Sequence, residues 1–275
     1  MFAKLLKYEW RATRGFLGLL SLICLSAALV GGLSMRYLVW VSELDTQEDV
    51  AIVLSVLTMI FAFIVIAIGA AAMQFFTLWR FYKSRFTDEG YLTFTLPVTT
   101  HQILLSGFVN CLLGVLSSLV ALGISYLVLL LLGFSALDNF FPSLWEVLPL
   151  AMENLWRLFS GETGTFLGLF LLEIVTGTFS GVLTMMLSVT IGCILAKKHK
   201  VVVSVAVYFG ISMAISMITS VLGAIQGIVS YTSQAASGVS TLSSMMLSGS
   251  VLAVVVAIGA YWLMYALVHR KLNLT

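Results

Sequence analysis

VAIVLSVLTMIFAFIVIAIGAAAMQFFTLW, residues 50–79, is a run of 30 residues without an Asp, Glu, Lys or Arg. At about 1.5 Å per residue, a helix of this length exceeds the roughly 30 Å hydrocarbon core of a bilayer. We therefore expect it to cross a membrane while tilting or protruding at its ends. The rest of the chain has the same character, since 60% of its 275 residues are hydrophobic and 9% are charged, against roughly 25% charged residues in a soluble domain.

Uncharged runs recur on both sides of this segment and predict an all-α integral membrane protein. The longest run, residues 201–268, would form a helix of about 100 Å, so we expect two spans there, separated by an external hairpin in residues 230–244. These runs form a single transmembrane domain, residues 15–275, with six predicted spans: residues 16–40, 50–79, 102–137, 164–196, 201–228 and 247–268.

The N-terminal residues 1–14 show the pattern of an amphipathic helix. Its cations share one face at 100° per residue: Lys4, Lys7, Arg11 and Arg14. Such a helix is expected to lie on an anionic lipid surface. Glu9 lies in the middle of the opposite, apolar face, where either an open helix end or a buried ion pair would accommodate it.

Positive charge is distributed unevenly between the predicted loops. Twelve of the fourteen Lys and Arg residues lie on the N-terminal side of the spans, and only Arg36 and Arg157 lie on the other side. The positive-inside rule therefore predicts that both termini are cytoplasmic. The net charge of +2 gives no reason to expect a nucleic-acid partner.

Motifs for catalysis and for metal binding are missing from the sequence. The chain has three histidines and no H-E-x-x-H, G-x-S-x-G or Walker-type phosphate loop. Its three cysteines all fall inside apolar runs, which argues against a zinc site or a disulfide framework. We therefore expect no catalytic residue, no metal site, no bound cofactor and no enzyme activity in this chain.

Glu173 is the only charged residue well inside a predicted span. A carboxylate at that depth costs on the order of 3 kcal/mol on insertion scales, so it should face protein or a wet cavity. Three interpretations remain open: contact with a substrate, proton-coupled movement, or a structural hydrogen bond to a Thr or Ser on a neighbouring helix. The nearby Thr176 and Thr178 favour the last of these.

The connection of residues 80–101, between the second and third predicted spans, combines three cations, two acids and a proline. Apolar and polar side chains alternate over residues 91–96, as in an extended segment, and Pro97 ends this alternation. Gly90 permits a sharp turn before it, and the pair Thr99 and Gln102 matches a capping box at the start of the next helix. A simple linker does not need exposed apolar side chains such as Tyr91 and its apolar neighbours. We therefore expect this connection to be a docking loop.

The run of residues 88–106, DEGYLTFTLPVTTHQILLS, resembles the cytoplasmic loop between the second and third spans of type-2 ABC transporter permeases. The sequence KYEWR at residues 7–11 is similar to the start of that family, and six spans without an ATPase domain fit its architecture over the whole chain. One departure is Gly107, where many relatives carry Lys.

This resemblance implies the permease subunit of a bacterial ABC exporter in the cytoplasmic membrane. Such a subunit pairs with a second copy or a sister permease and binds two separate ATPase subunits, which hold ATP and Mg. The residues implied to dock the ATPase are Asp88, Glu89, Gly90, Tyr91, Leu92, Phe94, Leu96 and Pro97. The alternatives are an ATP-independent ion- or proton-coupled carrier that uses Glu173, or a membrane assembly scaffold.

Overall fold

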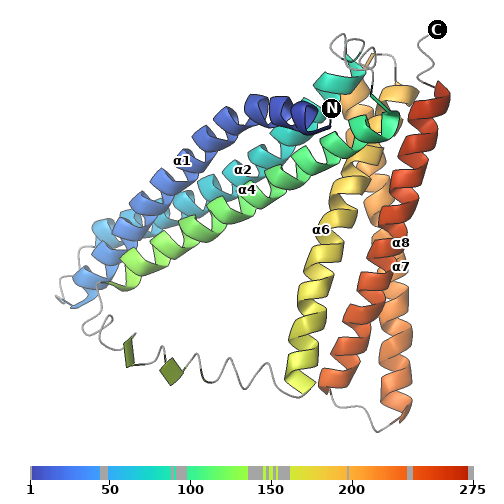
Figure 1. Cartoon of the computed structure of the whole chain (residues 1–275). Coiled ribbons are helices and arrows are strands. Elements are labelled where there is room, and N and C mark those ends of the chain that lie inside the picture. The colour runs from blue at the N-terminus through green and yellow to red at the C-terminus, as the bar shows by residue number, and fades with distance from the viewer. Residues whose placement is uncertain are drawn as a thin grey trace. The chain divides into compact units, whose positions relative to one another are not determined.

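The computed structural model describes residues 2–43, 49–87, 90, 98–135, 145–146, 149–150, 153, 162–196, 198–233 and 238–271. Within these residues the chain forms six long α-helices, labelled in Figure 1: α1 (Phe2–Glu43), α2 (Asp49–Phe86), α4 (Thr100–Phe134), α6 (Glu162–Leu195), α7 (Lys200–Ser233) and α8 (Gly238–Lys271). Each contains a segment long and apolar enough to cross a membrane. The predicted all-α membrane fold with six spans is confirmed at this level.

The helices extend beyond the predicted spans, and the largest difference concerns the hairpin expected at residues 230–244. That prediction is wrong in its extent, because α7 continues to Ser233 and α8 already begins at Gly238. The hydroxyl-rich residues donate to carbonyl groups of their own helix, as Thr232 does to Val229 at 2.9 Å. Ser and Thr in a hydrophobic helix satisfy their hydroxyls in this way, so a polar stretch need not interrupt it.

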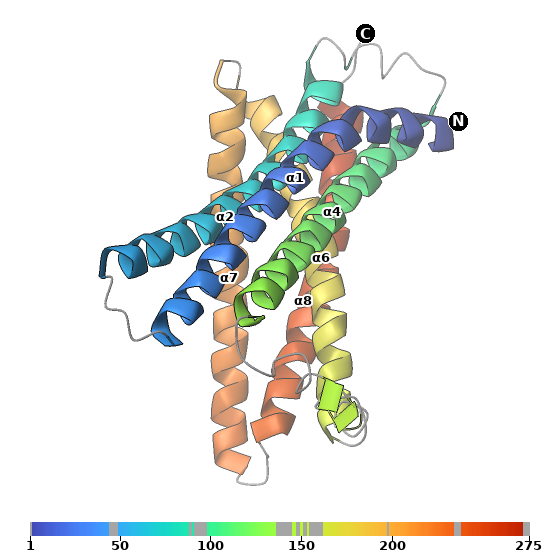
Figure 2. The ribbon, with the colours of Figure 1, turned by 90° about the vertical axis from the view of Figure 1, so that its left-hand side faces the viewer.

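Residues 2–14 lie in the same continuous helix as the first span. In Figure 2 the N-terminal part of α1 bends away from the axis of the remainder. Near this part, the hydroxyl of Thr13 donates to the carbonyl oxygens of Glu9 at 3.3 Å and Trp10 at 3.2 Å. Bonds of this kind often bend helices. The position of the segment on a lipid surface stays a prediction.

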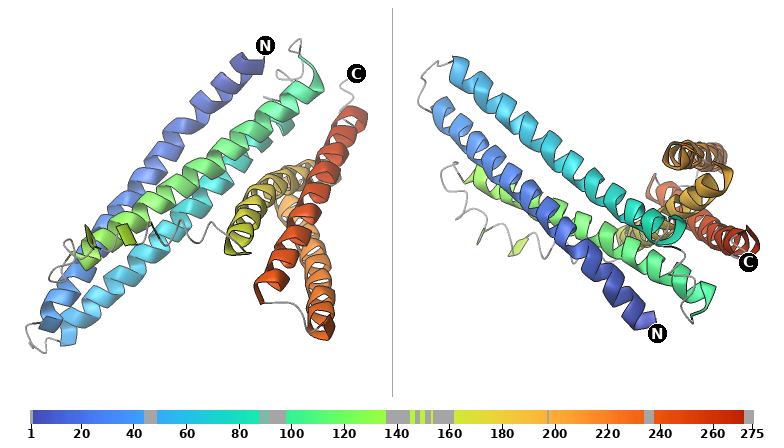
Figure 3. Two further views of the ribbon diagram at one scale, coloured as in Figure 1. Left: turned by 60° about the horizontal axis from the view of Figure 1, so that its bottom comes forward. Right: turned by 90° about the horizontal axis from the view of Figure 1, so that it is seen from above.

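One compact unit consists mainly of α1, α2 as far as Arg80 and the part of α4 that follows Val109. These helices run side by side in both panels of Figure 3. Their buried side chains form two clusters: Leu17, Cys24, Met73 and Ala121 in one, and Ala28, Ile66 and Leu129 in the other. Small residues bring the helices together, since a Cβ at Gly31 would lie 2.6 Å from that of Ala62.

The second unit contains α6, α7 and α8 together with the segment Phe81–Phe108. Within it, α6 packs most extensively against α8 and also contacts α7. The boundary between the units therefore cuts through α2 and α4. The last turns of α2 and the first turns of α4 group with the C-terminal helices, and this grouping positions the candidate site.

Candidate functional site

Seven of the eight residues predicted to dock an ATPase lie outside the described residues: Asp88, Glu89, Tyr91, Leu92, Phe94, Leu96 and Pro97. The eighth, Gly90, is buried, and its N–H donates to the carbonyl of Thr87 at 2.8 Å. A Cβ at position 90 would collide with the carbonyl oxygen of Arg85. Gly90 is therefore required for a close approach of two backbone segments.

We name two described segments, residues 81–87 and 98–108 on either side of this loop, the docking-loop roots. They are joined by Arg85, whose side chain is only 3% exposed. Its Nη2 donates to the carbonyl of Ile103 at 2.8 Å and to the hydroxyl of Ser106 at 3.1 Å, both in the first two turns of α4. The planar guanidinium group suits such divided donation. Arg85 thus ties the end of α2 to the beginning of α4.

Gly107 provides the space that this guanidinium group occupies. A Cβ at position 107 would lie 2.7 Å from Cζ and Nη2 of Arg85 and 2.9 Å from the ring of Phe81. The guanidinium carbon also lies 4.8 Å from the centroid of the Phe81 ring, within the range of a cation–π interaction. The departure at Gly107 from the residue common in the resembling family therefore has a steric reason.

The structure contains one of the two hydrogen bonds of the capping box predicted at Thr99, the bond to the Thr99 side chain. The backbone N–H of Gln102 lies 3.4 Å from the hydroxyl oxygen of Thr99, as expected of an N-cap residue. This cap stabilises the first turn of α4, which contains His101.

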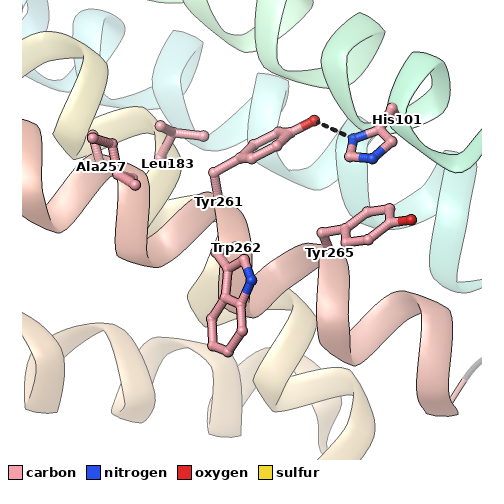
Figure 4. Close-up of a pocket in the computed structure, with 7 residues that line it drawn as sticks. His101, Leu183, Ala257, Tyr261, Trp262 and Tyr265 are labelled. Atoms are coloured by element: carbon pink, nitrogen blue, oxygen red, sulfur yellow. Dashed lines mark hydrogen bonds between the residues drawn. The ribbon is translucent and has the colours of Figure 1, made fainter.

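His101 joins the docking-loop roots to α8. Its Nδ1 shares a hydrogen bond of 3.0 Å with the hydroxyl of Tyr261, as Figure 4 shows. Its ring also stacks on Tyr265, with centroids 4.0 Å apart and an interplanar angle of 12°. Sequence reasoning treated His101 only as a histidine near a charged segment. No local pattern could have paired it with residues 160 positions later.

A cavity of about 370 Å³ lies beside these rings. The residues labelled around it in Figure 4 come from α4, α6 and α8: His101, Leu183, Ala257, Tyr261, Trp262 and Tyr265. Trp262 is 66% exposed. Aromatic residues near the ends of spanning helices are usual at a membrane interface, so this cavity alone does not define a ligand.

Glu173 lies half-buried on α6, and its carboxylate lies against α8 at Gly249. A Cβ at position 249 would be 2.8 Å from Oε1 of Glu173. Thr176 and Thr178, which made a structural hydrogen bond the favoured interpretation, do not donate to the Glu173 carboxylate. Both hydroxyls donate to carbonyls of their own helix, at 2.9 Å to Leu172 and at 2.7 Å to Ile174 respectively.

The four cations predicted to contact lipid all have exposed side chains: Lys4, Lys7, Arg11 and Arg14. Glu9, on the same helix, is half-buried. Exposure leaves these cations available for a lipid surface. Their contact with lipid stays a prediction.

Among the described residues, no cluster of three or more His, Cys, Asp or Glu side chains could hold a metal ion. Comparisons with protein-family models, curated proteins and solved structures found no match to the chain.

Proposed function

We propose that the chain is the transmembrane permease subunit of an ATP-driven ABC exporter, whose separate ATPase subunits dock on the loop between α2 and α4. The observation that carries the proposal is the rigid attachment of this loop by Arg85. A loop that transmits movement from a partner must have ends that are held in place by contacts with the adjoining helices. Hydrogen bonds from a buried charged group contribute roughly 1.5–3 kcal/mol each, which makes such a junction stiff.

The contact of His101 with α8 supports the same proposal. It extends the docking-loop roots to a helix that packs extensively against α6. A displacement of the first turn of α4 would therefore act on α8 through a hydrogen bond and a stacked ring pair. A simple connector between two spans has no need for this contact.

In the proposed assembly, this subunit pairs with a second copy or a sister permease, and substrate moves between the two six-helix halves. Two ATPase subunits bind ATP and Mg on the cytoplasmic side of a bacterial cell membrane, where both termini also lie. The exposed cations of the N-terminal segment would then contact anionic lipid on that side. This chain contributes the pathway and the docking loop.

The proposal is tested by purifying the tagged full-length chain from its own host in mild detergent and measuring ATP hydrolysis in the eluate. We expect an ATPase to co-purify with the native chain and to be lost with Glu89→Ala combined with Leu96→Ala. A Glu146→Ala variant, altered at an exposed residue of another connection, should retain it. Absence of ATP hydrolysis from the native eluate would overturn the proposal.

A second candidate function is an ion- or proton-coupled carrier, which the position of Glu173 inside α6 favours. The loop distinguishes the two functions, because a carrier should keep its flux after Glu89→Ala or Pro97→Ala. An exporter should lose ATP-driven flux in both variants. A scaffold would show no flux before or after either change.

A further inference from the structure

Glu173 lies at a depth that also contains polar groups of the two neighbouring helices. It is nine residues from Gly164, where the spanning part of α6 begins, and Gly249 is eight residues from Thr241 in α8. These separations correspond to depths of about 14 and 12 Å. At the same end of the unit, the hydroxyl of Ser248 donates to Oε1 of Gln226 in α7 at 3.3 Å. Three helices therefore place polar side chains at a similar depth.

The described part of the chain supplies no partner for the Glu173 carboxylate. Its nearest threonines donate to backbone carbonyls, and the hydroxyl of Ser248 donates to Gln226. No described Lys, Arg or His forms an ion pair with it. A charged group at this depth costs about 2.5–3.5 kcal/mol unless it is compensated. A charged Glu173 therefore requires a compensating group from outside the described residues.

Aromatic side chains lie beside the carboxylate on the same helix. Phe170 and Phe166 precede Glu173 by three and seven residues, so all three share one face of α6. Their rings are stacked with centroids 6.5 Å apart, and Phe170 is 44% exposed. A carboxylate on the same helix face as an exposed aromatic ring is suited to a cation with an apolar body, because the ring attracts positive charge and covers apolar surface.

We propose that Glu173, whose carboxylate lies against Gly249 of α8, binds together with Phe170 the cationic group of an amphipathic organic cation, and that this class of molecule is a substrate. The assignment of a substrate depends on the proposed transport function. Gly249 lies twelve residues before Tyr261 on α8, about 18 Å along the helix. The helix that contacts the docking-loop roots therefore also forms part of the binding site.

The test measures equilibrium binding of radiolabelled tetraphenylphosphonium to the full-length chain in lipid nanodiscs, without ATP. Triphenylphosphine oxide serves as the neutral probe of similar shape. Glu173→Gln should weaken binding of the cation about tenfold, which corresponds to about 1.4 kcal/mol, and should leave the neutral probe unchanged. Glu173→Asp should restore part of the affinity. The matched control Glu146→Gln, at an exposed site, should change neither.

The proposal is overturned if the native chain does not bind tetraphenylphosphonium, or if Glu173→Gln weakens both probes equally. It is also overturned if the cation binds equally well to the native chain and to Glu173→Gln. Failure of the transport proposal is detected separately, because binding is measured without an ATPase. Co-purification of an ATPase without Glu173-dependent binding would overturn this inference alone. Glu173-dependent binding without an ATPase would overturn the exporter and the assignment of the cation as its substrate, and would leave the binding site at Glu173.

Discussion

The buried position of the Arg85 side chain depends on the absence of a side chain at Gly107. The guanidinium group occupies the space where a Cβ of residue 107 would lie, 2.7 Å from Nη2. The sequence shows Arg85 only as one of three cations in a charged connection. Its burial could not be predicted because it depends on how α2 meets α4, which no local pattern records.

Substitution of Gly107 by Ala should therefore destabilise the protein. Overpacking at a tightly filled site costs about 1–3 kcal/mol, and we expect a lower melting temperature in detergent. Gly123→Ala on the same helix is the matched control, because a Cβ there meets no atom within 4 Å. Ala is the better helix former, so the control should melt at the same temperature or higher. Equal melting of both variants would contradict the packing described for Arg85.

Arg85→Lys tests the hydrogen bonds of the same site. A single ammonium group cannot reproduce the planar arrangement of donors that reaches Ile103, Ser106 and Ser84. We expect a loss of about 1–3 kcal/mol in unfolding free energy, since buried acceptors lose donors. Arg11→Lys, at an exposed position of α1, provides a comparison that should be milder. A neutral effect at Arg85 would show that the guanidinium geometry is not needed.

Secondary structure elements show which parts of the fold could be predicted from sequence. The six helices follow from uncharged length alone, because a bilayer requires about 20 apolar residues per span. Their ends were less predictable: residues 230–244 contain many Ser and Thr, yet much of this stretch is helical because hydroxyls donate to their own backbone. The cap at Thr99 was predictable, since its signal is local. The contact of His101 with α8 was not, since it joins distant segments.

His101→Ala should weaken the attachment of α4 to α8. The variant loses a stacked ring pair, worth about 0.5–1.5 kcal/mol, and a hydrogen bond worth about 1 kcal/mol. We expect a lower melting temperature while the ATPase still co-purifies, because the predicted docking residues lie elsewhere in the loop. His199→Ala, in the exposed turn before α7, should leave the melting temperature unchanged. Loss of ATPase binding in His101→Ala alone would place His101 on the docking surface instead.

At the scale of the whole molecule, the predicted orientation has both termini and the docking loop in the cytoplasm. It can be measured with single cysteines introduced at exposed positions after Cys24, Cys111 and Cys193 are replaced. A membrane-impermeant maleimide should label Trp145→Cys in intact cells and Lys198→Cys only after permeabilisation. The opposite labelling pattern would show that the chain has the reverse orientation in the membrane. It would also remove the docking loop from the compartment that contains ATP.

Contact of the loop between α2 and α4 with an ATPase can be measured by site-specific photocrosslinking. A photoreactive phenylalanine analogue at Tyr91 is irradiated in intact cells, and the crosslinked proteins are identified by mass spectrometry. The same analogue at Trp145 serves as the control. We expect the analogue at Tyr91 to crosslink to a protein with ABC ATPase motifs and the analogue at Trp145 not to do so. Crosslinks from Tyr91 that contain only lipid or this chain would contradict this expectation.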